Sequence, residues 1–280
     1  QASQQLFESL AFRGISGPNA LNGMITSKIV PSFSENTINN PVHPTSGHSF
    51  YVAADFSGLG GNVRLIRPIV EYKRWYPVNK GRNAIGYRIQ GSFITGYGGV
   101  VAPPFQRFYQ GGDTDLRGFD IRSASPIAFL TTNVNIGLTN PDGSGVPVDP
   151  NNPRRGNVTI PLPVQTLVYP GGDTSIVTNL EYRVPIAGPV TMAAFMDTGW
   201  NMALRQGELR LAQQQLDLLN STPFGCASID PTTFNCTGTR TFQFNKDVVP
   251  ISATNYLTRM STGLELQVIM PIVNAPFRIY

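Results

Sequence analysis

The sequence predicts an all-β fold, an antiparallel transmembrane β-barrel, and three observations favour it. Apolar and polar residues alternate with a period of two over long stretches, the pattern of a strand with one apolar and one polar face. Charged residues make up only 14% of the 280 residues, against about a quarter in a typical soluble domain. Short turns alternate with much longer connections, as they do between the two ends of an outer-membrane barrel. We assign residues 1–280 to one barrel domain.

The composition disfavours several other classes of protein. A hydrophobic fraction of 41% with little charge suits strands that pair a lipid-facing apolar row with an uncharged polar row facing a lumen. No stretch approaches the roughly 18 apolar residues of a transmembrane helix. The net charge is only +4, and no basic run with interleaved aromatics indicates a nucleic-acid partner. Residues 1–5 lack a charged and apolar leader, so we expect any export signal to lie outside this sequence.

The clearest strand covers residues 84–98, where Tyr87 and Ile89 alternate with Arg88 and Gln90. This length suits a tilted strand that crosses a bilayer, which needs about 9–11 residues. The same alternation predicts strands from residue 23 to a turn at 39–47, then at 48–57, 63–77, 174–184, 190–200 and 261–270, and the start of another at 277–280.

The strand at 63–77 carries three charges on one face. Arg67, Glu71 and Lys73 share a parity opposite the apolar one. Charged groups cannot all lie in a dry core without partners, so we expect this face to line a water-filled lumen.

The connections differ sharply in length. Two are very long, at 99–172 and 201–258, and we expect both on the extracellular side of the barrel. The first is predicted to be irregular and to fold back into the lumen, because unstructured loops of this length are usually specialised. Leucines and good helix formers at 204–220 predict a short helix in the second, more simply a loop-packing element than a partner-binding helix.

The two cysteines, Cys226 and Cys236, lie close together in the second long connection. Their spacing favours a disulfide that staples the loop in an oxidising compartment, although two free thiols remain the alternative. No further Cys or His lies near them in the sequence, so we predict no metal site.

One loop motif at 108–120 organises the rest of the chain. Gly111 and Gly112 allow the backbone to turn back on itself, and Arg117 then follows Leu116 as a single cation projected into whatever the loop contacts. Alone, this arginine is most simply an ordinary loop residue.

Two carboxylates give that arginine a partner. Glu181 and Asp197 have lumen parity on consecutive strands joined by a tight turn, and counting from the turn places them at similar heights. A guanidinium from an infolded loop could bind both. They could instead pair with Arg183 or Arg88. Acid/base catalysis is disfavoured because the sequence offers no nucleophile motif and no nearby histidine.

Four motifs in order carry a resemblance to a known family. The chain resembles the C-terminal barrel of the BamA-type outer-membrane assembly family. The motifs are FYQGG at 108–112 with LRGF at 116–119, NLEYR at 179–183 with Pro185, FMDTG at 195–199, and GLEL at 263–266 with Pro271. The resemblance implies a 16-stranded barrel whose sixth extracellular loop folds into the lumen.

The resemblance also implies roles for particular residues. The arginine of the loop tip would contact acidic residues on two neighbouring strands, with aromatic side chains packed around the contact. By motif these residues are Arg117, Gly118, Phe119, Glu181, Phe195 and Asp197, supported by Gly111, Gly112 and Leu116 in the loop. The chain supplies only about seven to nine strands, and a closed barrel of about eight has no room for such a loop. We therefore expect the C-terminal part of a larger protein.

The family likeness implies a non-enzymatic function without a cofactor. Family members insert β-barrel proteins into the bacterial outer membrane. The implied partners are unfolded outer-membrane β-barrel proteins, accessory assembly lipoproteins and outer-membrane lipid. Two alternatives share the barrel: a polypeptide-secretion pore, and a barrel domain appended to a phospholipase. This chain contains no Gly-x-Ser-x-Gly elbow for the latter. A diffusion porin is disfavoured, because an infolded loop would obstruct its lumen.

Overall fold

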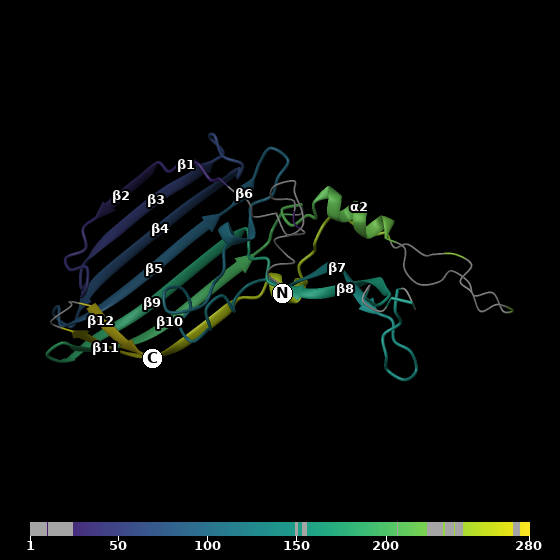
Figure 1. Ribbon diagram of the computed structural model, residues 1–280. Coiled ribbons are helices and arrows are strands. Elements are labelled where there is room, and N and C mark those ends of the chain that lie inside the picture. The colour runs from purple at the N-terminus through teal and green to yellow at the C-terminus, as the bar shows by residue number, and fades with distance from the viewer. Residues whose placement is uncertain are drawn as a thin grey trace.

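The computed structural model describes residues 10, 25–148, 151–152, 156–205, 207–222, 232, 238, 243–270 and 275–280. Their main feature is one antiparallel sheet of long, slanted strands (Figure 1). Its path runs β1, β3, β4, β5, β9, β10, β11, β12, while β2 pairs with β3 and β6 with β4. The predicted all-β antiparallel fold is confirmed. The strands are β1 (Lys28–Ile29), β2 (Ser32–Asn36), β3 (Gly47–Ser57), β4 (Leu65–Val78), β5 (Asn83–Phe93), β6 (Thr95–Gly96), β9 (Thr174–Ala187), β10 (Val190–Met202), β11 (Arg259–Met270) and β12 (Ala275–Ile279).

The two faces of the sheet differ in chemistry. On β10, Thr191, Ala193, Phe195 and Asp197 are buried, while the residues between them are exposed. We call the side that carries these four residues the polar face and the opposite side the apolar face. The apolar face exposes large side chains along the sheet, including Tyr76, Tyr87, Ile89, Leu180, Tyr182, Met192, Met196, Leu264 and Leu266. This alternation is the one predicted from the sequence.

Charged residues on the polar face of β3, β4 and β5 form ion pairs with one another. Arg67 on β4 pairs with Asp55 on β3 at 2.5 Å. Glu71 binds both Lys73 and Arg88, each at 2.7 Å. Arg67, Glu71 and Lys73, which the sequence predicts on one face of a strand, thus form ion pairs within β4 and with the neighbouring strands β3 and β5.

Two predicted strands are interrupted. The strand expected at 84–98 divides into β5 and β6 around Ile94, whose amide donates instead to the Asp173 carbonyl at 2.8 Å. The first predicted strand divides into β1 and β2, and Pro31 lies between them without an amide proton to donate. At the other end, β12 begins at Ala275, two residues before its predicted start.

The prediction that 99–172 is irregular was wrong for the part from 128 to 168. A two-stranded hairpin forms there from β7 (Ala128–Gly137) and β8 (Thr159–Val168), preceded by the 3-10 helix η1 (Pro104–Gln106). The alternation in β7 was present in the sequence, but the Pro/Gly/Asn-rich segment at 140–156 obscured its pairing partner. The long connection that contains this hairpin begins and ends at neighbouring strands of the large sheet, because β5 pairs directly with β9.

The hairpin belongs to a hydrophobic core whose members lie outside the strands of the large sheet. Figure 1 shows β7, β8 and α2 (Gln213–Ser221) beyond one end of the large sheet. The predicted short helix is confirmed as α2, in the second half of 204–220, and α3 (Ser252–Asn255) follows later. No helix among the described residues is long and apolar enough to cross a bilayer. The buried members of this core are Leu10, Val101, Ala128, Leu130, Val168, Leu209, Leu211, Leu219 and Val248.

Candidate functional site: an arginine clasp on the polar face

The loop at 110–119 is closed by its own backbone. Gly112 donates to the Phe119 carbonyl at 2.9 Å, and Leu116 donates to the Gly112 carbonyl at 3.1 Å. Gly111 has φ +116°, and a Cβ there would lie 2.3 Å from the Asp120 carbonyl oxygen. Glycine is therefore required at this position, both for its conformation and for the close approach of the backbone.

Two side chains dock this loop onto β9 and β10. The amide nitrogen of Gln110 donates to the Ser175 hydroxyl at 2.8 Å and to the carbonyls of Ile176 and Trp200 at 3.1 and 3.0 Å. Leu116 is fully buried above Gly199, where a Cβ would come within 2.7 Å of its Cδ1. The loop thus lies on the polar face, and the absence of a side chain at Gly199 leaves the space that Leu116 occupies.

Arg117 forms a bidentate pair with Asp197. Its Nε donates to Oδ2 and its Nη2 to Oδ1, both at 2.7 Å, and its backbone amide donates to Oδ2 at 3.1 Å. Planar carboxylates match the guanidinium fork, which makes this geometry both strong and specific. Asp197 is completely buried and Arg117 is 3% exposed.

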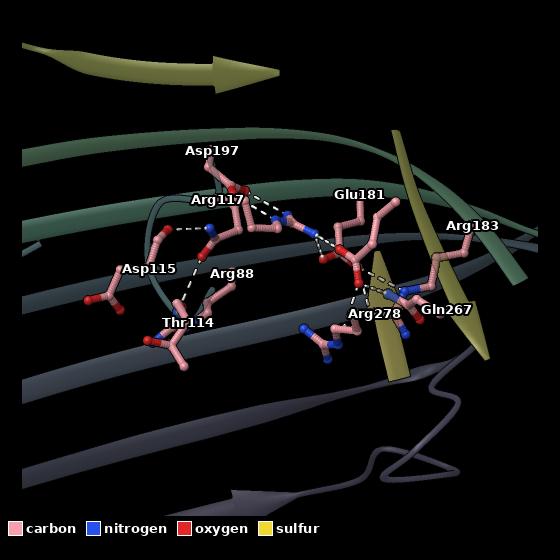
Figure 2. A network of polar contacts seen from close by, with 11 residues as sticks. Arg88, Thr114, Asp115, Arg117, Glu181, Arg183, Asp197, Gln267 and Arg278 are labelled. Atoms are coloured by element: carbon pink, nitrogen blue, oxygen red, sulfur yellow. Dashed lines mark hydrogen bonds and ion pairs between the residues drawn. The ribbon is translucent and has the colours of Figure 1, made fainter. Parts of the chain in front are cut away.

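The same guanidinium binds two further carboxylates. Its Nη1 donates to Glu181 at 2.7 Å and to Glu265 at 2.6 Å. Figure 2 shows Arg117 reaching between Asp197 and Glu181, with Arg183 and Arg278 close by. We call Arg117, Glu181, Asp197 and Glu265 the arginine clasp. It joins the loop to β9, β10 and β11.

Sequence reasoning missed Glu265. It is fully buried on β11, opposite Ala193, and faces the same side as Phe195. Alternation along the strand indicates which face of the sheet Glu265 is on. It does not indicate how far along the sheet Glu265 lies from Asp197. A tight turn fixes the register of β9 and β10, whereas a connection of more than fifty residues separates β10 from β11.

The two predicted carboxylates, Glu181 and Asp197, do not lie directly opposite each other on β9 and β10. Glu181 lies opposite Phe195, and Asp197 lies opposite Asn179. Similar heights were predicted, and the register instead places them diagonally. A residue pair near the turn is irregular, with a register shift between Val190 and Thr191. Counting from the turn therefore placed the two carboxylates within one same-face pair of their true alignment.

The aromatic residues take different positions. The Arg117 guanidinium lies 4.0 Å from the centre of the Phe195 ring, a cation–π contact. Phe195 in turn covers Gly263, where a Cβ would lie 2.8 Å from the ring. Phe119 is half-buried and closes the loop through its backbone, so packing of its ring around the clasp stays a prediction. Gly118 has φ +79° beside the arginine.

Charge in the clasp is balanced by neighbouring arginines. Arg183 binds Glu181 at 2.7 Å, as the alternative sequence interpretation proposed, and Arg278 approaches Glu265 at 3.4 Å. Burial opposes the charged guanidinium of Arg117, but the carboxylates of Asp197, Glu181 and Glu265 outweigh it and raise its pKa. In the same loop, burial raises the pKa of Asp115.

Comparison with known proteins identifies the family. The family model described as the Omp85 superfamily domain matches residues 19–279, almost the whole sequence. The chain belongs to the Omp85 superfamily. The predicted membership of the BamA-type barrel group is confirmed.

Individual Omp85 relatives match over smaller parts of their own length. The outer membrane protein assembly factor BamA of Nitratidesulfovibrio vulgaris (strain Hildenborough) is 31% identical over 96 residues, which cover 34% of this chain and 12% of that protein. The crystal structure of BamA from Haemophilus ducreyi lacking POTRA domains 1-3 aligns with 89% of this chain and 37% of its own, at 18% identity and a TM-score of 0.49. This chain spans a minor part of either relative.

The side chains of this Omp85 site are joined by ion pairs. Arginine guanidinium groups hold every carboxylate of the clasp. Among the described residues, no group of three or more His, Cys, Asp or Glu side chains could hold a metal ion. Cys226 and Cys236, the predicted disulfide, lie outside the described residues.

We expect Glu265→Gln to weaken the clasp without opening it. Glutamine keeps an acceptor oxygen for Arg117 but loses the charge, and a charge-assisted hydrogen bond is about twice as strong as a neutral one. The loss should be about 1 kcal/mol of unfolding free energy, measured by urea unfolding of the full-length protein in lipid. Glu35→Gln is the matched control, because Glu35 is an exposed carboxylate on β2 that pairs with His48 away from the clasp, and we expect it to change the stability far less. A Glu265→Gln variant as unstable as one lacking Arg117 would contradict a supporting role.

Proposed function

We propose that this chain is the C-terminal part of an integral β-barrel in the bacterial outer membrane that inserts and folds other β-barrel proteins there. Residues 99–172 then form an extracellular loop folded into the lumen, and 201–258 a second extracellular loop. The observation that carries the proposal is the arginine clasp, which fixes the loop at 110–119 to three strands of the polar face.

A clasped loop suits an assembly factor better than an open channel. The clasp places the loop across the polar face, where a diffusive pore needs free water. Its ion pairs are buried, and buried pairs contribute more to a defined arrangement than to net stability. The loop would therefore act as a fixed internal support that holds β9, β10 and β11 in register.

Client proteins would be recognised through strand pairing. An unpaired strand edge offers a row of backbone donors and acceptors to another chain, and strand addition is a recurring mode of polypeptide recognition. The proposed partners are unfolded outer-membrane β-barrel proteins, accessory assembly lipoproteins and the surrounding lipid. The proposed activity needs no cofactor and no catalytic residue.

Depletion of the full-length protein in its own cells tests this function. We expect several different outer-membrane β-barrel proteins to lose their folded, heat-modifiable form together and to accumulate in the periplasm. A plasmid copy of the gene should restore them. A lipoprotein anchored in the outer membrane without a barrel serves as the control, because its level should change little.

Other outcomes would point elsewhere. Loss of a single exported polypeptide, with all barrel proteins intact, would overturn the proposal in favour of a secretion pore. Loss of phospholipid hydrolysis with barrel assembly unchanged would overturn it in favour of a barrel attached to a phospholipase.

A further inference from the structure

A cavity of about 570 Å³ lies beside the clasp on the polar face. Strands β4, β5 and β9 form its floor, and the loop at 113–117 forms one wall. The lining residues are Lys73, Trp75, Gly86, Tyr87, Arg88, Asp113, Thr114, Arg117, Asn179, Glu181, Arg183 and Arg278.

A glycine and an aromatic ring shape this cavity. Trp75, Gly86 and Glu181 lie in one row across β4, β5 and β9. The Trp75 ring folds over Gly86, where a Cβ would lie only 2.2 Å from it. The guanidinium of Arg183 lies 4.2 Å from the centre of the same ring. The tryptophan therefore holds this arginine in place through a cation–π contact.

Cations outnumber carboxylates in the lining. Five lining side chains are cationic and two, Asp113 and Glu181, are acidic. Arg117 is occupied by the three carboxylates of the clasp. Lys73 and Arg88 share Glu71, which lies outside the lining. The remaining two cations, Arg183 and Arg278, thus decide what the cavity can bind.

Arg183 carries a buried donor without an acceptor. The residue is 8% exposed. Its Nε and Nη2 reach Glu181 at 2.8 and 2.7 Å, but its buried Nη1 has no hydrogen-bond partner within the described ranges. A buried, unpaired charged donor is costly, so it favours an incoming acceptor. Arg278 is 39% exposed and approaches Glu265 only through Nε, at 3.4 Å.

The acceptor that fits is a carboxylate. Guanidinium groups bind carboxylates and phosphates through matching planar or forked geometry. Glu181 already takes Nε and Nη2 of Arg183, which leaves Nη1 as the one donor of this arginine for an incoming group. A single carboxylate oxygen can use one donor, whereas a phosphate brings three strong acceptor oxygens that each need a partner. The Trp75 ring offers an apolar surface to the carbon atoms next to that carboxylate.

We propose that this cavity is a binding site for a carboxylate of a polypeptide, at its C-terminus or on an acidic side chain. Arg183 is the principal donor, and Arg278 and Lys73 supply further positive charge. The polypeptide as the source of the carboxylate rests on the proposed function, whereas the anion site itself does not. The loop at 113–117 closes one side, so the site exists only while the clasp holds that loop in place.

Peptide binding to the full-length protein in detergent micelles tests this site. The probes are fluorescent Ala-Ala-Phe peptides with a free C-terminal carboxylate, with an amidated C-terminus, or with an amidated C-terminus and one added glutamate. We expect the free acid to bind at least tenfold more tightly than the plain amide. Binding of the glutamate peptide would identify a side-chain carboxylate as an equal source, and its failure would restrict the site to C-termini.

Two variants and one control locate the site. Arg183→Gln should weaken binding of the free acid at least tenfold. Gly86→Ala should do the same without changing any charge, because its Cβ displaces Trp75 into the cavity. Arg74→Gln is the matched control, since Arg74 neighbours Lys73 on β4 but stacks on Tyr76 at the apolar face. Its binding should be unchanged.

Several results would overturn the inference. Equal affinity for acid and amide would exclude a carboxylate site, and so would unchanged binding by both cavity variants. Competition by inorganic phosphate as strong as that by acetate would remove the assignment to carboxylate. If depletion still blocks barrel assembly while no probe binds, the proposed function stands and the carboxylate site falls.

Discussion

Replacing Arg117 with alanine is expected to release the loop at 110–119 and to destabilise the protein by about 3–5 kcal/mol, the usual cost of removing one partner from a buried ion pair. Three carboxylates would then face one another, two of them completely buried. Limited proteolysis of the full-length protein should show new cleavage within 99–172, and urea unfolding in lipid should show the lower stability.

Matched variants separate the charge of the clasp from its geometry. Arg117→Lys keeps the charge but cannot form the bidentate pair, so we expect an intermediate effect. Adding Asp197→Asn to Arg117→Ala should recover part of the loss, because it removes one unpaired buried charge. Arg74→Ala, on the apolar face, should leave the loop protected. A loop as protease-resistant in Arg117→Ala as in the wild type would contradict the clasp as the element that holds it.

Residues close in sequence were placed well by the sequence alone. Alternation predicted both faces of β10, because Met192 and Met196 alternate with Ala193 and Asp197 through a regular strand. Side chains on a strand point to opposite faces by geometry, so parity needs no knowledge of the rest of the fold. The tight turn at 185–189 likewise predicted that the two strands beside it are neighbours, as β9 and β10 are.

Features that depend on register across long connections could not be predicted this way. Alternation along 261–270 indicates that Glu265 faces away from Leu264 and Leu266, but nothing local fixes its distance from Arg117. The two strands of the β7–β8 hairpin are separated by more than twenty residues in the sequence. The inner residues of the hairpin are buried against α2 and other segments that are distant in the sequence. The cavity beside Arg183 likewise forms where four strands (β4, β5, β9 and β12) and a loop meet.

The polar face is shaped as much by missing side chains as by charges. Gly86, Gly199 and Gly263 are strand glycines, and each lies beneath a large side chain: Trp75, Leu116 and Phe195 respectively. Glycine in a strand interior is otherwise unfavourable, and it often marks a close approach by another part of the structure. These three positions let a loop and two aromatic rings lie flat on the sheet, which brings Arg117 to the depth of its carboxylates.

Gly199→Val should therefore displace the loop although it alters no charge. A Cβ at this position would lie 2.7 Å from Leu116 Cδ1 and 2.5 Å from Gln110 Oε1. Leu116 is fully buried, and Gln110 is tied by three hydrogen bonds, so neither can yield without losing its own contacts. Overpacking of this kind costs about 1–3 kcal/mol, and we expect protease cleavage within 99–172 as for Arg117→Ala.

The control for this change exploits the preference of strands for valine. Valine favours strands more than glycine does, so the substitution should stabilise the sheet itself wherever no loop lies above it. Gly91→Val on β5 tests this, because a Cβ there meets no atom within 4 Å. We expect Gly91→Val to keep the loop protected and the unfolding midpoint unchanged or higher. If both valine variants behave alike, the space above Gly199 does not determine how the loop docks, and the clasp alone must hold it.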